Sequence, residues 1–261
     1  MAPLYPLLFS ALILGFNSHT LKFRHDRCEG DRSKMTERGC PIEMKVRQRQ
    51  VSPYEYNGGT ALAIAGDDFV VIASDTRLSA GYSILTRNCQ TSTKLTNQAV
   101  IATGGCRTDV ISLHKLLSIR MQQYKDAHKR EMQTHSVAQL LSNTLYYRRF
   151  FPFYAFNIVG GIDKNGKGAV YTYDAIGSFE CVKYASQGAG QKLIIPILDN
   201  VVGHKNRNDA KVKYTVSDVV ELVKDVFITA GEREIMVGDS IVYHVITKDG
   251  IKTDKFDLKK D

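Results

Sequence analysis

The residues of this chain whose types and spacing suit chemistry stand around one short junction, Asn57-Gly58-Gly59-Thr60. A threonine that becomes the first residue of a chain can act as a nucleophile, with its own α-amine as the base. Cleavage between Gly59 and Thr60 would create such a group. The cluster Ser74-Asp75-Thr76-Arg77 follows and supplies a carboxylate. The structural alternatives are that Thr60 is a β-branched strand residue and that Asp75 and Arg77 form a pair holding a strand end.

Strands must position these groups, because the junction and the Asp75 cluster flank apolar, β-branched runs separated by hairpin signals. The predicted strands span 60–65, 69–74, 99–103, 154–162, 168–173, 178–184, 240–247 and 251–256. Apolar residues at three- and four-residue spacing predict four helices. They span 109–124, 136–147 with Ser136 as N-cap, 191–199, and a last helix that starts at the capping box Thr215-x-x-Asp218.

The order of these elements predicts the fold class. Short turns between consecutive strands make the strands antiparallel, and grouped strands and helices indicate an α+β fold. We expect two antiparallel sheets packed face to face with helix pairs outside, a four-layer αββα sandwich.

Composition and charge argue against nucleic-acid binding and against a metal site. The chain has 261 residues, a formal net charge of +8 and an ordinary globular composition. Its basic residues are scattered and no nucleic-acid motif accompanies them, so a solvated surface or acidic neighbours in an assembly explain the charge better than nucleic acid. The five cysteines are widely spaced, with no histidine at zinc spacing, which predicts reduced thiols and no metal site.

The N-terminal part leaves several interpretations open. Residues 4–16 are almost wholly apolar, but no lysine or arginine precedes them and the run is short for a membrane span. It is a signal peptide, a removable prosegment, or an upstream extension that is not translated; we favour the last two. Residues 17–49 are polar and lack periodicity. We therefore expect an N-terminal extension or prosegment over 1–49 and one domain over 50–261.

The motifs over residues 50–261 resemble the proteasome β-subunits, which belong to the N-terminal nucleophile hydrolase superfamily. The segments that carry the resemblance are Ser52-Pro53-Tyr54, Asn57-Gly58-Gly59-Thr60, Ala63-Ile64-Ala65-Gly66, Ser74-Asp75-Thr76-Arg77-Leu78-Ser79, Arg148-Arg149-Phe150-Phe151-Pro152, Gly166-Lys167-Gly168-Ala169-Val170-Tyr171, Leu198-Asp199-Asn200 and Val223-Lys224-Asp225-Val226-Phe227. The resemblance implies the same four-layer sandwich.

Carried over position by position, the resemblance implies a site that has lost its nucleophile. Counting back without a gap from the acidic residue places the nucleophile position at a glycine. The family's acidic residue falls on Asp75, its nucleophile on Gly59 and its oxyanion-hole glycine on Gly105. Its supporting serine falls on Ala189, its second acidic residue on Glu234 and its second serine on Val237. The family's lysine falls on Thr91 by ungapped counting, or on Lys94 by local sequence. Without a nucleophile hydroxyl, an oxyanion hole cannot lead to an acyl-enzyme.

The resemblance therefore implies a non-catalytic, structural β-subunit of the 20S proteasome core particle in ubiquitin-dependent protein degradation. It implies contacts with other β-subunits of the same and the opposite ring, with α-ring subunits and with assembly chaperones, in cytoplasm and nucleus, without cofactor, metal, nucleic acid or membrane. It also implies trimming before Gln50 by active neighbours. The segment 146–154 is the candidate interface, or else a cluster of core rings at a helix end.

Two other functions stay open. Thr60 is the N-terminal nucleophile of an active threonine peptidase if the chain is cut before it, which requires a shift of one residue relative to Asp75. Alternatively, residues 1–20 are the signal of a secreted or lumenal protein, which would be expected to form disulfides.

Overall fold

The computed structural model describes residues 53–205 and 213–260. The expected extension 1–49 and the cleavage before Gln50 lie outside the described residues. Sixteen elements follow one another along the described chain. They are β1 Thr60–Ala65, β2 Val70–Asp75, β3 Leu78–Ala80, β4 Ser83–Thr86, β5 Ser92–Thr96, β6 Ala99–Gly105, α1 Arg107–His128, α2 Thr134–Tyr146, β7 Ala155–Ile162, β8 Gly168–Tyr173, β9 Phe179–Val182, β10 Tyr184–Gly188, α3 Gln191–Val201, α4 Val216–Gly231, β11 Ser240–Thr247 and β12 Gly250–Asp257.

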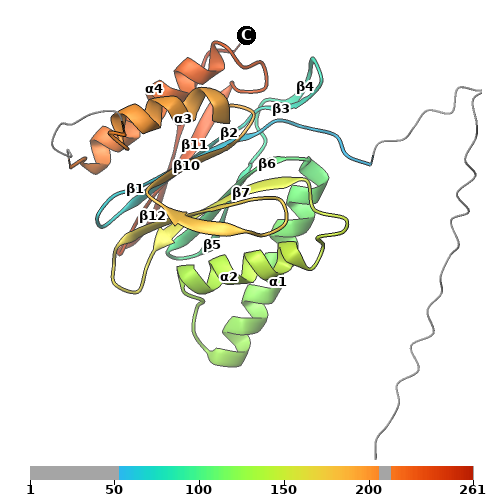
Figure 1. Cartoon of the computed structure of the whole chain (residues 1–261), viewed down its shortest axis with the longest axis vertical. Coiled ribbons are helices and arrows are strands. Elements are labelled where there is room, and N and C mark those ends of the chain that lie inside the picture. Colours follow the sequence, from blue (N-terminus) through green and yellow to red (C-terminus); the bar gives the residue numbers. More distant parts are fainter. Residues whose placement is uncertain (1–52, 206–212, 261) are drawn as a thin grey trace, which may run out of the picture. The chain divides into compact units, whose positions relative to one another are not determined.

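Two five-stranded antiparallel sheets form the centre of the fold, in the orders β10-β1-β2-β11-β12 and β5-β6-β7-β8-β9. In Figure 1, α3 and α4 cover the outer face of the first sheet, and α1 and α2 cover the outer face of the second. The predicted α+β sandwich of four layers is confirmed. None of the helices within 53–205 and 213–260 is long and apolar enough to cross a membrane.

The alternation of side chains along β1 builds two of the three hydrophobic layers. Ala61 and Ala63 face the second sheet, where small side chains let the two sheets approach. Leu62 and Ile64 point the other way and pack under α3 and α4. A third layer lies between the second sheet and α1 and α2. A one-residue shift of β1 would exchange these faces, so the burial fixes its register and the place of Thr60 at its start.

Three local predictions are wrong. The single strand expected over 178–184 is two strands, β9 and β10, that lie in different sheets. The short strands β3, β4 and β5 were not expected. Ser136 is not the N-cap of α2: the helix starts at Thr134 after Gln133. The Thr134 hydroxyl donates to the Ile162 carbonyl at 2.6 Å, so a contact with β7 sets this start. The capping box of Thr215 and Asp218 is confirmed.

Candidate functional site

The junction before β1 has a left-handed backbone. Gly58 and Gly59 have φ of +79° and +83°, a region that side chains with a Cβ rarely adopt. A Cβ on Gly59 would lie 3.1 Å from the Cα of Gly104, so the opposite backbone also approaches closely. Glycine at these two positions is therefore required by the local geometry as well as being chemically inert.

The residues ahead of β1 are hydrogen-bonded through their backbone to the end of β6 on one side and to β3 on the other. The Asn57 N–H donates to the Gly105 carbonyl at 3.1 Å, and the Gly105 N–H donates to the Gly58 carbonyl at 2.9 Å. On the other side, the Ser79 N–H donates to the Asn57 carbonyl at 3.2 Å. The Gly105 N–H, which the resemblance assigns to the oxyanion hole, is thus occupied by the chain's own backbone.

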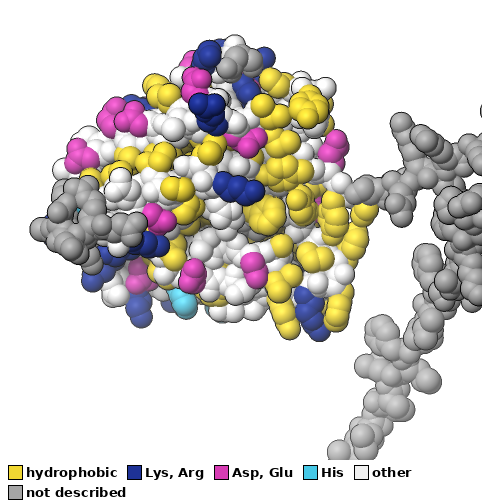
Figure 2. Space-filling model, turned by 45° about the horizontal axis from the view of Figure 1, so that its top comes forward, with side chains coloured by type: hydrophobic (Ala, Val, Ile, Leu, Met, Phe, Trp, Pro, Cys, Tyr) yellow, Lys and Arg dark blue, Asp and Glu magenta, His cyan; other side chains and the backbone are white. Residues whose placement is uncertain are grey.

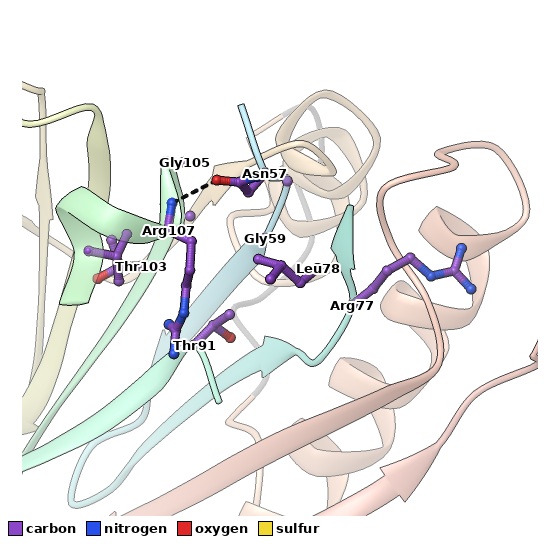
Figure 3. A pocket seen from close by; sticks show the side chains of 11 residues that line it. Asn57, Gly59, Arg77, Leu78, Thr91, Thr103, Gly105 and Arg107 are labelled. Carbon is purple, nitrogen blue, oxygen red and sulfur yellow. Dashed lines mark hydrogen bonds between the residues drawn. The ribbon is translucent and has the colours of Figure 1, made fainter. Parts of the chain in front are cut away.

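The side chain of Asn57 fixes this segment further. Its Oδ1 accepts from the Arg107 N–H at the start of α1 at 2.9 Å, as the dashed line in Figure 3 shows. Its Nδ2 donates to the Ser79 carbonyl at 3.2 Å. A buried side chain with both ends of its amide bonded holds one conformation firmly. Sequence reasoning missed this role of Asn57, although the residue stands in the motif that carried the resemblance.

Thr60 is fully buried and both of its polar groups are in use. Its N–H donates to Asp75 Oδ1 at 2.8 Å, and its hydroxyl accepts from the Gly190 N–H at 3.0 Å. As a peptide nitrogen, the Thr60 N–H cannot act as a base. In this arrangement Thr60 is a strand residue that links β1 to β2 and to the start of α3.

Asp75 lies fully buried at the end of β2, and its second carboxylate oxygen has no hydrogen-bond partner. Burial raises the pKa of Asp75 to about 8, against the opposing effects of the Thr60 N–H and the Arg77 charge. The protonated, neutral form is therefore favoured near neutral pH, because removing its proton leaves an incompletely compensated charge in a dry site.

An Asp75→Asn substitution is expected to remove a pH dependence of stability. The folded state holds a proton on Asp75 up to about pH 8, whereas the unfolded chain loses it near pH 4. Stability is full below about pH 4 and is lost as the pH rises toward 8, on the order of a few kcal/mol. Urea unfolding at pH 5, 6.5 and 8 checks this. Asp68→Asn, at an exposed hairpin position, is the control; parallel curves for wild type and Asp75→Asn would contradict the prediction.

Arg77 forms its ion pair with Asp239 rather than with Asp75, which corrects the pair expected at the strand end. Arg77 Nε donates to Asp239 Oδ2 at 2.9 Å, and Arg87 also bonds the same carboxylate. Figure 3 shows the Arg77 side chain directed away from the pocket. Burial by itself would raise the pKa of Asp239, but hydrogen bonds from Arg77 and Arg87 outweigh it and hold that pKa below its usual value.

The lysine position of the resemblance is filled by Thr91. Thr91 lines the pocket beside Gly59, and its hydroxyl donates to the Asp75 carbonyl at 2.7 Å. Lys94 lies further along β5 with an exposed side chain and does not line the pocket, so the structure does not bring it together with Gly59 and Asp75. The hairpin β5–β6 shows why: Lys94 pairs with Val100, several residues before Gly105. Arg107 reaches toward Thr91 instead, and no local pattern of residues predicts this direction (Figure 3).

The other three site positions that the resemblance implies are Ala189, Glu234 and Val237. None of these side chains carries a hydroxyl group. The Ala189 N–H donates to the Gly59 carbonyl at 3.2 Å. Val237 is buried near Thr60 and Gly190, since a Cβ on Gly190 would meet both side chains within 3.3 Å. Glu234 is partly buried and its carboxylate accepts from the Met236 N–H at 3.3 Å. The two acidic positions are therefore filled by Asp75 and Glu234, whereas Gly59, Ala189 and Val237 carry no hydroxyl group.

The space left at this site is small. The pocket between the junction, β6 and α1 leaves about 10 Å³, roughly enough for one water molecule. Its wall residue Thr103 donates its hydroxyl to Asn157 and contacts the His114 ring at 2.9 Å, so that hydroxyl is also in use. Within 53–205 and 213–260, no group of His, Cys, Asp and Glu is arranged to hold a metal ion.

Comparison with known proteins matches this description. The family model described as "Proteasome subunit" matches residues 55–246. Proteasome subunit beta type-1 of Drosophila melanogaster is 50% identical over 219 residues, covering 83% of this chain and 93% of the relative. The Arabidopsis thaliana and Dictyostelium discoideum proteins of the same name are each 48% identical, over 80% and 84% of this chain and 96% and 94% of the relatives. The chain belongs to the proteasome-subunit family.

Proposed function

We propose that this chain is a non-catalytic β-subunit of the 20S proteasome core particle and serves ubiquitin-dependent protein degradation by building the chamber. The observation that carries the proposal is the glycine at the nucleophile position, Gly59, whose left-handed junction is bonded to Gly105 on one side and to Ser79 on the other. A subunit with no hydroxyl at this position and no free oxyanion donor contributes surfaces and walls rather than a cutting site.

The proposal includes the partners and the place of action. The relatives are named as proteasome subunits, so we propose that this chain assembles with neighbouring and opposite β-subunits and with α-ring subunits, helped by assembly chaperones. We propose that it acts in cytoplasm and nucleus. The proposed role requires no cofactor.

The mature N-terminus of the chain in purified particles tests this function. We expect mass spectrometry to find trimming upstream of Asn57, with Gln50 as the first residue, because residues 57–59 are bonded on both sides and protected. An N-terminus at Gly59 or Thr60 would overturn the non-catalytic role.

A covalent inhibitor directed at N-terminal threonines provides the second readout. We expect no labelling of this chain, while the active subunits of the same particle are labelled and serve as the positive control. The alternative, an active peptidase that uses Thr60, predicts a labelled Thr60 instead. It also requires the Thr60 hydroxyl to give up its bond with the Gly190 N–H.

A further inference from the structure

A cluster of exposed aromatic and basic side chains lies on the turn that joins α2 to β7. We call residues 146–151 the Arg-aromatic turn. All six consecutive residues are exposed, and its rings are among the most exposed large side chains of the described chain. Their exposed fractions are 55% for Tyr146, 82% for Tyr147, 88% for Phe150 and 60% for Phe151. These four rings are therefore not core rings, whereas Phe153, in the same predicted segment 146–154, is 5% exposed and packs in the core.

The Arg-aromatic turn is ordered by its own contacts. The Arg149 guanidinium lies over the rings of Tyr146 and Phe150, 4.8 and 4.4 Å from their centroids. Backbone bonds from Arg149 N–H to the Tyr146 carbonyl and from Phe151 N–H to the Arg148 carbonyl close the turn. Such stacking holds the side chains in place before any partner arrives, which lowers the entropy lost on binding.

The segment that leads to the junction supports the turn from the other side. The Tyr54 ring stacks on Phe151 with centroids 5.5 Å apart, and the Tyr54 hydroxyl donates to the Pro152 carbonyl at 2.7 Å. Figure 2 shows hydrophobic side chains gathered on the side of the molecule where the described chain begins. The turn thus belongs to a wider apolar surface, of the kind that marks an interface in proteins that assemble.

The charge of this surface indicates what covers it. Neither Arg148 nor Arg149 has an ion pair or a hydrogen bond to a carboxylate anywhere in the described residues, and the Arg148 guanidinium lies over the Phe153 ring at 4.7 Å. Exposed guanidinium groups held between aromatic rings are suited to bind carboxylates that arrive with apolar side chains around them.

We infer that the Arg-aromatic turn is the docking surface for a protein segment that presents acidic side chains among apolar ones. The inference rests on the proposed function, because the segment belongs to a neighbouring subunit. Single-stranded nucleic acid fits less well, since it needs open ring faces along a basic groove. Here Arg149 and Tyr54 already cover faces of Tyr146, Phe150 and Phe151.

Charge reversal in the full-length chain tests the inference. Particles are purified from cells that express tagged wild type, Arg149→Glu, or the control Lys164→Glu, which changes an exposed lysine in the β7–β8 turn. We expect incorporation of Arg149→Glu to fall about tenfold, because a like charge then faces the partner's carboxylates. We expect Arg149→Lys to restore most of it. Urea unfolding of the full-length chains checks that Arg149→Glu still folds.

A second measurement identifies the partner's chemistry without relying on the loss of assembly. Particles carrying Arg149→Lys are treated with a carbodiimide, which joins lysine to carboxylates in direct contact. We expect cross-links from position 149 to Asp or Glu of one neighbouring subunit. Absence of these cross-links, together with normal incorporation of Arg149→Glu, would overturn the inference.

Other occupants give distinct results that also overturn the inference. Binding of a fluorescent 20-nucleotide poly-dT by the full-length chain, lost in Arg149→Glu, would indicate nucleic acid. Dimers of the isolated chain in light scattering, lost in the same variant, would indicate a second copy. If wild type enters particles but the charge-reversal and cross-linking results overturn the inference, the proposed function still stands. If wild type is absent from particles, the proposed function itself fails.

Discussion

A Gly59→Thr variant is expected to remain uncut and inactive in the particle, and to be less stable than wild type. The new residue must adopt φ near +83°, and its Cβ must lie 3.1 Å from the Gly104 backbone. The strain of a left-handed, β-branched residue and this contact together cost about 2–3 kcal/mol. Restoring the hydroxyl does not restore chemistry either, because Gly105 N–H stays bonded to Gly58 and Ala189 and Val237 provide no hydroxyl.

The control for Gly59→Thr is Gly81→Thr. Gly81 also has a positive φ, +57°, but a Cβ there meets nothing within 4 Å. Gly81→Thr therefore carries only the backbone strain and should lower the urea midpoint less. Mass spectrometry of particles containing Gly59→Thr gives the second readout. A new N-terminus at position 59 together with inhibitor labelling there would show that the site needs only its hydroxyl, contrary to this prediction.

An Asp239→Asn variant is expected to lose about 3 kcal/mol of stability. Asp239 is 1% exposed and Arg77 is 5% exposed, so removing the carboxylate charge leaves a buried guanidinium without its counter-ion. Asparagine is the suitable replacement, because Asp239 has φ of +66° and asparagine tolerates this conformation better than most residues. The measured loss then reports the charge rather than the backbone.

The pH dependence of this variant adds a separate check. The pKa of Asp239 is lowered in the folded state, so the stability that it provides is present above the unfolded pKa of about 4. This contribution is lost as the pH falls through the folded pKa, and wild type and Asp239→Asn should converge in acid. Asp249→Asn, in the exposed β11–β12 turn, is the matched control. Equal stability of Asp239→Asn and wild type at pH 7 would argue against the prediction.

The sequence predicted the fold well where hydrophobic period and turn chemistry act together. The hairpin of β1 and β2 and the capping box at Thr215 depend on local signals, and both are present. The division of 178–184 into β9 and β10 could not be predicted, because apolar alternation says that a strand is half buried but not in which sheet. The chain passes from one sheet to the other at Lys183, whose carbonyl accepts from the Ala65 N–H.

The candidate site could be predicted at the positions whose residue spacing from Asp75 matches the spacing in the family. Ungapped counting from Asp75 led to Gly59 and to Thr91, and both line the pocket. Local similarity favoured Lys94, which is exposed and lies outside the pocket, because a short motif does not report which way a strand residue points. The directions of Asn57 and Arg107 depend on contacts between β1, β3 and α1, which no local pattern of the sequence encodes.

The order of strands in the first sheet also has a consequence for synthesis of the chain. β2 lies between β1 and β11, and β11 starts only at Ser240. At ordinary translation rates the ribosome needs roughly ten to thirty seconds between completing β2 and completing β11. During that interval β2 has an open edge whose six residues, VVIASD, carry several apolar side chains. The nascent chain therefore has a defined period in which it needs protection from wrong strand pairing, and this period ends when β11 is made.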